Sequence, residues 1–241
     1  MTKASLFNRN VGVLVNRFWN QWLPPFIRDS KWVMFFPMLF TFRKQRNLVF
    51  KFREMCYEMS DEAYQDAYVL TEKYNINQKT DLNSACIKKI LNEIKGRNVL
   101  EAGCGRGYLL EKLTAKTILQ VTGTDLVKTT EINELIRDNK IQFKQSKLEI
   151  LPFEDNEFDT TICTHVLEHV RDIQLSLKEL RRVTSKRLII VVPKERPYQF
   201  GFNLHLSFFP YRFSVLHTFQ PKDNYFCGLI GGDWFYIEDY K

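Results

Sequence analysis

The sequence predicts an α/β fold in which helices cover both faces of a mostly parallel sheet. Short apolar runs alternate with helix-like segments between residues 98 and 192, and a glycine-rich turn joins the first run to a helix. The last run, RLIIVV at residues 187–192, has almost no polar face. Strands that alternate with helices form parallel sheets, and a continuously apolar strand is buried on both sides.

The elements are justified in order along the chain by spacing and by turn residues. Two helices precede the sheet, one after the capping residue Ser60 and one with apolar residues at helical spacing over residues 81–94. Strands are expected at residues 98–102, 118–124, 141–145, 158–164 and 187–192. Helices are expected at residues 108–114, 127–138 and 173–183. Gly231 and Gly232 predict a hairpin turn before a final strand.

Composition predicts a basic, aromatic N-terminal extension at residues 1–59 and a main domain at residues 60–241. Residues 1–53 contain ten lysines and arginines against one acid, Asp29, so they carry a charge of +9. The net charge of the whole chain is +7, so the remaining residues sum to −2. Three roles remain open for this extension: contact with an anionic membrane surface, a helical lid on the domain, or nucleic-acid binding. Its run WVMFFPMLFTF is more apolar than a nucleic-acid face needs, which favours the membrane surface and makes nucleic acid the least favoured partner.

The cysteines and the apolar runs exclude several classes of protein. The five cysteines are scattered, and no CxxC pair occurs, so neither a zinc site nor a disulfide framework is expected. No signal-peptide pattern is present, and the longest apolar run, 11 residues, is shorter than the roughly 20 that a membrane-spanning helix needs. We therefore expect a cytoplasmic protein, with peripheral membrane contact as the open alternative.

The strongest chemical signal is the segment VLEAGCGRG, residues 99–107, in which a strand enters glycines at 103, 105 and 107. Glycines allow a tight turn and let a ligand approach the backbone closely. A dinucleotide fingerprint would need a glycine at position 108, which is Tyr108, and the Lys-Ser/Thr pair of a P-loop is missing. Asp125 ends the next strand, about 20 residues on, where an acid can accept both hydroxyls of a ribose.

These residues resemble motif I of the class I methyltransferases that depend on S-adenosylmethionine (SAM). The segment LPFEDNEFDTTICTHVLEHV, residues 151–170, is similar to the LPF…FD…LEH stretch of their small-molecule branch. The resemblance covers roughly residues 81–193. It implies a Rossmann-like fold with a seven-stranded sheet, SAM as cofactor, and a final segment, residues 193–241, that caps the acceptor side and ends in a hairpin.

The resemblance also implies which residues bind the cofactor. The glycine turn and Glu101 hold the methionine end, Asp125 holds the ribose, and the adenine lies near Leu126 and Leu148. The full expected set is Glu101, Ala102, Gly103, Cys104, Gly105, Gly107, Asp125, Leu126, Leu148 and Thr164.

A general base is needed only if the acceptor must lose a proton, and the candidates are His165, His169 and His205. Each also has a plain structural alternative. We expect methyl transfer to a small molecule, a sugar (glycan) or a lipid-linked acceptor. Two alternatives remain open: an RNA or protein methyltransferase, and a SAM-binding scaffold without catalysis.

Overall fold

The computed structural model describes residues 23–33, 35, 46–72, 80–200, 203–222 and 224–240. The chain divides into two compact units. The first comprises residues 1–78 and 195–205, and the second comprises residues 79–194 and 206–241. Much of the N-terminal extension, including residues 34 and 36–42 of its apolar run, lies outside the described residues. Within the described part of the chain, no helix is long and apolar enough to cross a membrane.

The described helices of the first unit are α2 (Pro25–Arg28), α4 (Arg46–Met55) and α5 (Asp61–Glu72). The Arg53 guanidinium on α4 donates hydrogen bonds to the carbonyl oxygens of His205 (2.7 Å), Asn203 (2.9 Å) and Gln199 (3.0 Å). On the same helix, the ring of Phe52 contacts two tyrosine rings of α5. These contacts explain why α5 and the distant segment 195–205 cluster with the N-terminal residues, although composition grouped both with the main domain.

The second unit contains a seven-stranded sheet, which confirms the predicted fold class. The strand order is β3-β2-β1-β4-β5-β7-β6. The strands are β1 (Asn98–Ala102), β2 (Gln120–Asp125), β3 (Gln142–Gln145), β4 (Phe158–Thr164), β5 (Thr184–Pro193), β6 (Tyr225–Ile230) and β7 (Asp233–Asp239). Neighbours among β1 to β5 pair in parallel, whereas β7 is antiparallel to β5 and β6 is antiparallel to β7.

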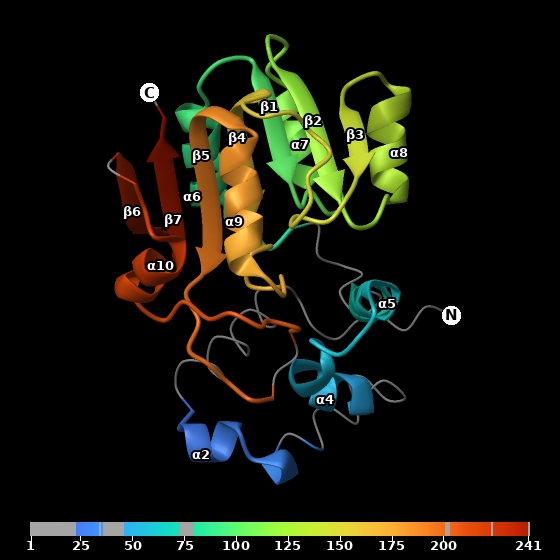
Figure 1. Ribbon diagram of the computed structural model, residues 1–241, viewed down its shortest axis with the longest axis vertical. Helices are drawn as coiled ribbons and strands as arrows, with labels where there is room; N and C mark the ends of the chain where they lie inside the picture. The colour runs from blue at the N-terminus through green and yellow to red at the C-terminus, as the bar shows by residue number, and fades with distance from the viewer. Residues whose placement is uncertain are drawn as a thin grey trace. The chain divides into compact units, whose positions relative to one another are not determined.

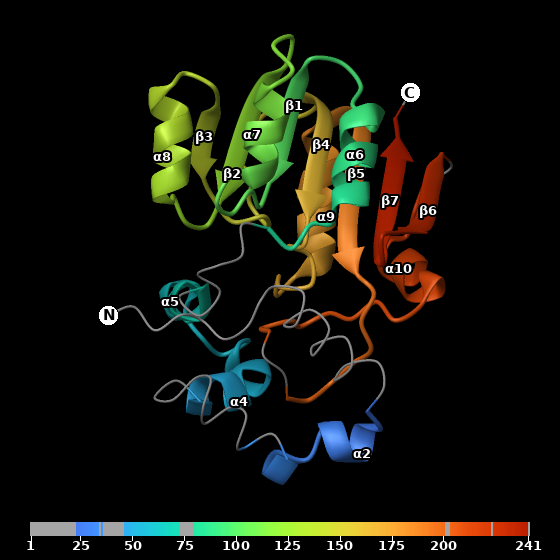
Figure 2. The ribbon, with the colours of Figure 1, turned by 180° about the vertical axis from the view of Figure 1, so that it is seen from behind.

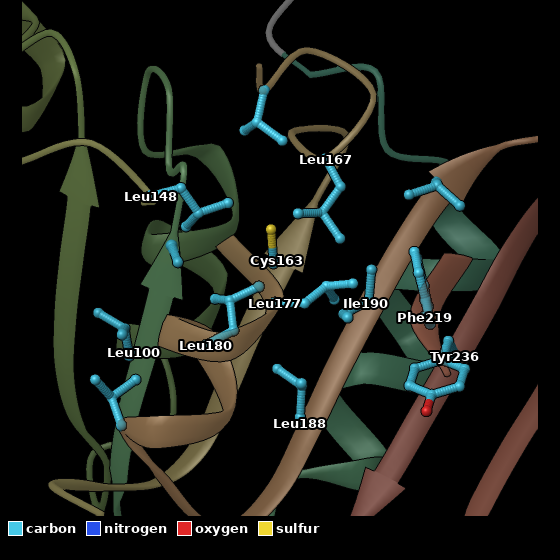
Figure 3. Packing of buried hydrophobic residues seen from close by; sticks show 14 of the residues in the cluster. Leu100, Leu148, Cys163, Leu167, Leu177, Leu180, Leu188, Ile190, Phe219 and Tyr236 are labelled. Carbon is cyan, nitrogen blue, oxygen red and sulfur yellow. The ribbon is translucent and has the colours of Figure 1, made fainter. Parts of the chain in front are cut away.

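Helices cover both faces of this sheet, as Figures 1 and 2 show from opposite sides. One face carries α6 (Ser84–Glu93), α7 (Tyr108–Thr114) and α8 (Thr130–Arg137), and the other carries α9 (Ile173–Arg182) and α10 (Arg212–Phe219). Figure 3 shows the packing on the α9 side, where Leu177 and Leu180 lie against Cys163 and Ile190 of the sheet. The sheet is therefore buried on both sides.

The order in which strands are added to the sheet reverses between β1 and β4. From β1 the chain moves outward to β2 and β3, and it then returns to β4 and β5 on the other side of β1. In open α/β sheets, ligands bind outside the carboxyl ends of the strands at such a reversal. The fold thus directs attention to the residues that follow β1, β2 and β4.

Candidate functional site

The turn after β1 has a backbone shape that an L side chain would oppose. Gly103 has a φ of +78°, and a Cβ atom added there would lie 2.2 Å from a methyl carbon of Val166. The backbone N–H groups of Gly103 and Cys104 both donate to the carbonyl oxygen of Thr124, at 2.8 and 3.0 Å. The turn is therefore held against the end of β2, and Gly103 makes room for the residues that follow β4.

Gly105 has a different environment. Its φ is +52°, and a Cβ atom built there would meet no atom within 4 Å. Its N–H donates to Oδ2 of Asp125 at 2.7 Å, and the N–H of Val127 donates to Oδ1 at 3.2 Å. The backbone at Gly105 is thus open to a ligand on the side where an aspartate is already held in place.

Two carboxyl groups lie in this region with little water around them. Glu101 is buried, and no described residue hydrogen-bonds to its Oε2 atom. Burial raises the pKa of Glu101 well above its usual range, and the charge of Asp125 raises it further. Burial also raises the pKa of Asp125, against the lowering effect of the backbone N–H donors of Gly105 and Val127. An unsatisfied buried acceptor is costly, so this pair suits a ligand that brings N–H or O–H donors.

The other predicted cofactor residues lie at the same edge of the second unit. Ala102 pairs in register with Thr124 of β2 and Cys163 of β4, so the ends of three strands meet there. The turn continues through Cys104, which is buried, to Gly107, which precedes α7. The remaining three follow or end neighbouring strands: Leu126 follows β2, Leu148 follows β3 and Thr164 ends β4. The structure brings all ten residues together at one sheet edge, and their binding roles stay predictions.

His165, the first residue after β4, is partly buried between two acids. Its Nδ1 lies 3.4 Å from Oε1 of Glu168, and its Nε2 lies 3.5 Å from Oδ2 of Asp233. Burial alone would lower the pKa of His165, but the two carboxylates outweigh it and raise the pKa to about 10. At neutral pH the ring is an imidazolium, which weighs against a role as general base.

The other two candidate histidines differ from His165 and from each other. His169 is half-buried on the same loop, and its backbone N–H donates to the carbonyl oxygen of Val166 at 2.9 Å. His205 belongs to the first unit, where its Nδ1 lies 2.7 Å from Oε2 of Glu195. No finding tests a catalytic role for any of the three, so these roles stay predictions.

Sequence reasoning missed the acidic partners of His165. Glu168 lies in the segment of residues 151–170 that resembles known methyltransferases, but the sequence pattern pointed only to His165 and His169 there. Asp233 opens β7, 68 residues beyond His165, and no local pattern marks it. Only the antiparallel pairing of β7 with β5, in which Asp233 pairs with Pro193, brings it to this edge of the sheet.

A family model described as "Methyltransferase domain" matches residues 100–192, the segment that runs from the glycine turn through β5. The chain contains a class I SAM-dependent methyltransferase domain. Among curated relatives, a ubiquinone biosynthesis O-methyltransferase of Nitrosospira multiformis is 37% identical over 84 residues, which are 33% of this chain and 35% of that protein. A tRNA U34 carboxymethyltransferase of Nautilia profundicola is 33% identical over 100 residues, which are 39% of this chain and 33% of that protein.

Solved structures agree on the fold of the methyltransferase domain. A SAM-dependent methyltransferase from Aquifex aeolicus aligns with a TM-score of 0.54 at 18% identity, covering 70% of this chain and 97% of that one. A protein from Pyrococcus horikoshii aligns with a TM-score of 0.57 at 19% identity, covering 70% of this chain and 99% of that one. By contrast, the chain spans only about a third of the length of the two curated relatives named above.

S-adenosylmethionine is the cofactor that this domain implies, and the residues present fit it. The cofactor has an ammonium group and two ribose hydroxyls, all of which are hydrogen-bond donors. Glu101 offers a buried oxygen without a partner among the described residues, and Asp125 offers a carboxylate beside the open backbone of Gly105. The domain therefore retains the acceptors and the open turn that such a ligand needs.

Proposed function

We propose that the protein transfers a methyl group from S-adenosylmethionine to a small molecule, a sugar or a lipid-linked acceptor. The observation that carries this proposal is the open backbone at Gly105 beside the carboxyl groups of Glu101, which is buried, and Asp125, which is partly buried. The matches to ubiquinone biosynthesis O-methyltransferases, which act in the making of a small molecule, support the choice of acceptor class.

The bound cofactor supplies a methyl group that is already activated as part of a sulfonium. The task of the chain is then to bind, orient and exclude water. Glu101 and the turn at Gly103 and Gly105 hold one end of the cofactor, and Asp125 holds its ribose. Fixing two reactants in line removes most of the entropic barrier to their reaction. If the acceptor must lose a proton, His169 is the better-suited histidine of the domain, because the imidazolium of His165 has no free base to offer.

Calorimetric titration with SAM and with S-adenosylhomocysteine, with NAD as the negative ligand, tests the cofactor step. Micromolar binding of both SAM compounds and none of NAD is expected. Glu101→Gln should weaken binding, whereas Glu134→Gln, at an exposed acid of α8 whose ion pair is with Arg137, should not. A panel of phenols, sugars and lipid-linked acceptors with isotopically labelled SAM then tests transfer. SAM binding without transfer to any acceptor would favour the scaffold without catalysis.

The match to a tRNA-modifying enzyme keeps RNA as a second acceptor class. Phosphate contacts release counterions, so RNA binding weakens steeply as salt rises. Incubation of the protein with labelled SAM and bulk tRNA, in parallel with the small-molecule panel, separates the two classes. Label in the RNA fraction alone would overturn the small-molecule proposal.

We also propose that the N-terminal extension contacts an anionic membrane surface. Trp32 is 85% exposed and Phe26 is 78% exposed, and Lys31 lies next to Trp32 in the chain. The +9 charge of residues 1–53 is complementary to anionic headgroups, while aromatic side chains prefer the interface.

Co-sedimentation with vesicles of neutral lipid, and of neutral lipid mixed with phosphatidylglycerol, tests this contact. We expect binding to the anionic vesicles. Replacing both Phe26 and Trp32 by serine should weaken this binding about tenfold, because two aromatic side chains are then no longer buried in the membrane interface. Tyr57→Ser, at a 64% exposed aromatic residue of the same unit, is the matched control. Equal binding of the double variant and the parent protein would remove the proposal.

A further inference from the structure

We propose that Glu168, His165 and Asp233 form an ion triad that positions the loop after β4 against the cofactor turn. We call these three residues the ion triad. The proposal rests on the methyl transfer proposed above, because the loop in question borders the glycine turn. It adds two acids, Glu168 and Asp233, that act through His165 and not on the substrate.

The backbone at His165 is held in a conformation that favours glycine. Its φ is +55°, and its N–H donates to the carbonyl oxygen of Val191 on β5 at 2.9 Å. A positive φ is uncommon in residues other than glycine. It persists only where the surroundings hold the residue, most often at functional sites. The partly buried ring, at ion-pair distance from one acid on each nitrogen, provides that hold.

The outer acid of the triad is itself fixed in place. The amide of Asn83 donates to Oδ2 of Asp233 at 2.7 Å and to the carbonyl oxygen of Ile230 at 3.3 Å. The side-chain oxygen of Asn83 also caps α6 by accepting from the N–H of Cys86 at 2.9 Å. The start of α6 and the β6–β7 turn therefore hold Asp233, and through it the ring of His165.

The loop that the ion triad holds touches the cofactor turn directly. Val166, next to His165, fills the space that a Cβ atom of Gly103 would need. The carbonyl oxygen of Glu168 accepts from the N–H groups of Leu206 (2.7 Å) and Ser207 (3.1 Å), the start of the segment that leads to α10. One cation thus links the C-terminal hairpin, the glycine turn and the segment on the expected acceptor side.

The groups that set the charge of the ring come from two elements. Glu168 lies on the loop of His165, and Asp233 comes from β7, which pairs with β5 beside β4. Burial opposes the charge, but the two acids keep the ring an imidazolium with a pKa of about 10. Because each ring nitrogen lies at ion-pair distance from a carboxylate, the ring is a positioning residue and not a proton acceptor.

The first test needs no activity and uses a variant of the ion triad only to assign a signal. The chain has four histidines, so a nuclear magnetic resonance titration of the wild-type imidazole signals can follow each one. We expect the signals of the other three imidazole rings to be followed separately. The signal of His165 is assigned because it is lost in His165→Asn, and this ring should stay protonated through pH 8. A His165 ring that loses its proton near pH 6.5 would overturn the proposal.

The second test measures the affinity for S-adenosylhomocysteine by calorimetry. Asp233→Asn should weaken binding about two- to thirtyfold, the range expected for changes that act through packed neighbours. Asp233→Glu keeps the charge and should retain most of the affinity. Asp239→Asn is the matched control, because it removes a carboxylate at the other end of β7 that pairs with Lys95 and Arg187.

Equal affinities in Asp233→Asn and Asp239→Asn would overturn the proposal, because a loss of general stability would affect both. If Asp233→Asn does not fold, the wild-type titration still decides. If the wild-type protein binds no S-adenosylhomocysteine, the proposed function fails, whereas the titration continues to report on the ion triad alone.

Discussion

Two glycines of the same turn should respond differently to alanine. Gly103→Ala should lower the free energy of unfolding by about 2 to 5 kcal/mol, because left-handed backbone costs an alanine about 1 to 2 kcal/mol and overpacking adds about 1 to 3. The overpacking follows from the 2.2 Å approach of the new Cβ to Val166. Gly105→Ala should cost only the backbone part, about 1 to 2 kcal/mol, because its Cβ meets no atom within 4 Å.

Binding should show the opposite order. The Cβ of Gly105→Ala enters the space left open for the cofactor, so S-adenosylhomocysteine should bind at least about tenfold more weakly, a loss of about 1.4 kcal/mol. Urea unfolding followed by circular dichroism measures the stability, and calorimetry measures the affinity. Val166→Ala, combined with Gly103→Ala, should restore the overpacking part of the lost stability by removing the two methyl carbons that clash, while the backbone cost remains. Equal unfolding of the two glycine variants, or unchanged binding by Gly105→Ala, would refute this account of the turn.

Three further predictions follow from the described contacts. Asp125→Ala should weaken S-adenosylhomocysteine about tenfold or more in calorimetry, because hydrogen bonds to charged groups contribute most, and unchanged affinity would exclude the ribose assignment. Arg181→Met should cost about 3 to 5 kcal/mol in urea unfolding, because it leaves the fully buried carboxylate of Glu238 without its cation, and a loss below about 1 kcal/mol would contradict this. The ion pair with Lys186, together with backbone N–H donors, lowers the pKa of Asp159 to about 2. Its contribution should be complete above the unfolded-state pKa of about 3.9 and vanish as the pH falls towards 2, so the stability gap to Asp159→Asn, measured by unfolding from pH 6 to pH 2, should close.

Local patterns sufficed for the elements of the sheet domain. The predicted strands at residues 98–102 and 158–164 and the helix at residues 108–114 match β1, β4 and α7, and the other predicted strands and helices of the domain shift by a few residues at their ends. The reason is that spacing and turn residues act over a few positions. Helix α10 was not predicted, because Arg212–Phe219 has no distinct polar and apolar faces and so lacks a helical period.

The cofactor-binding part of the site could likewise be predicted from the sequence. Glycines at 103, 105 and 107 and an acid at 125 lie within 23 residues; the glycines follow β1 and the acid ends β2. Parallel strands bring their carboxyl ends to one edge, so the order of the elements already implied that these residues meet. The surroundings of His165 differ, because Asp233 is distant from it in the chain and shares no motif with it.

By itself, the sequence determined the fold class, the cofactor turn and the family of the domain, because those depend on short-range periodicity and on conformations that only glycine adopts easily. The tertiary structure alone decided that the partly buried ring of His165 lies between the carboxylates of Glu168 and Asp233, and that segment 195–205 clusters with α4 and α5. Such contacts join residues that are tens to more than a hundred positions apart. Their charge and burial arise only when packing removes water from both partners, and no local pattern records that event.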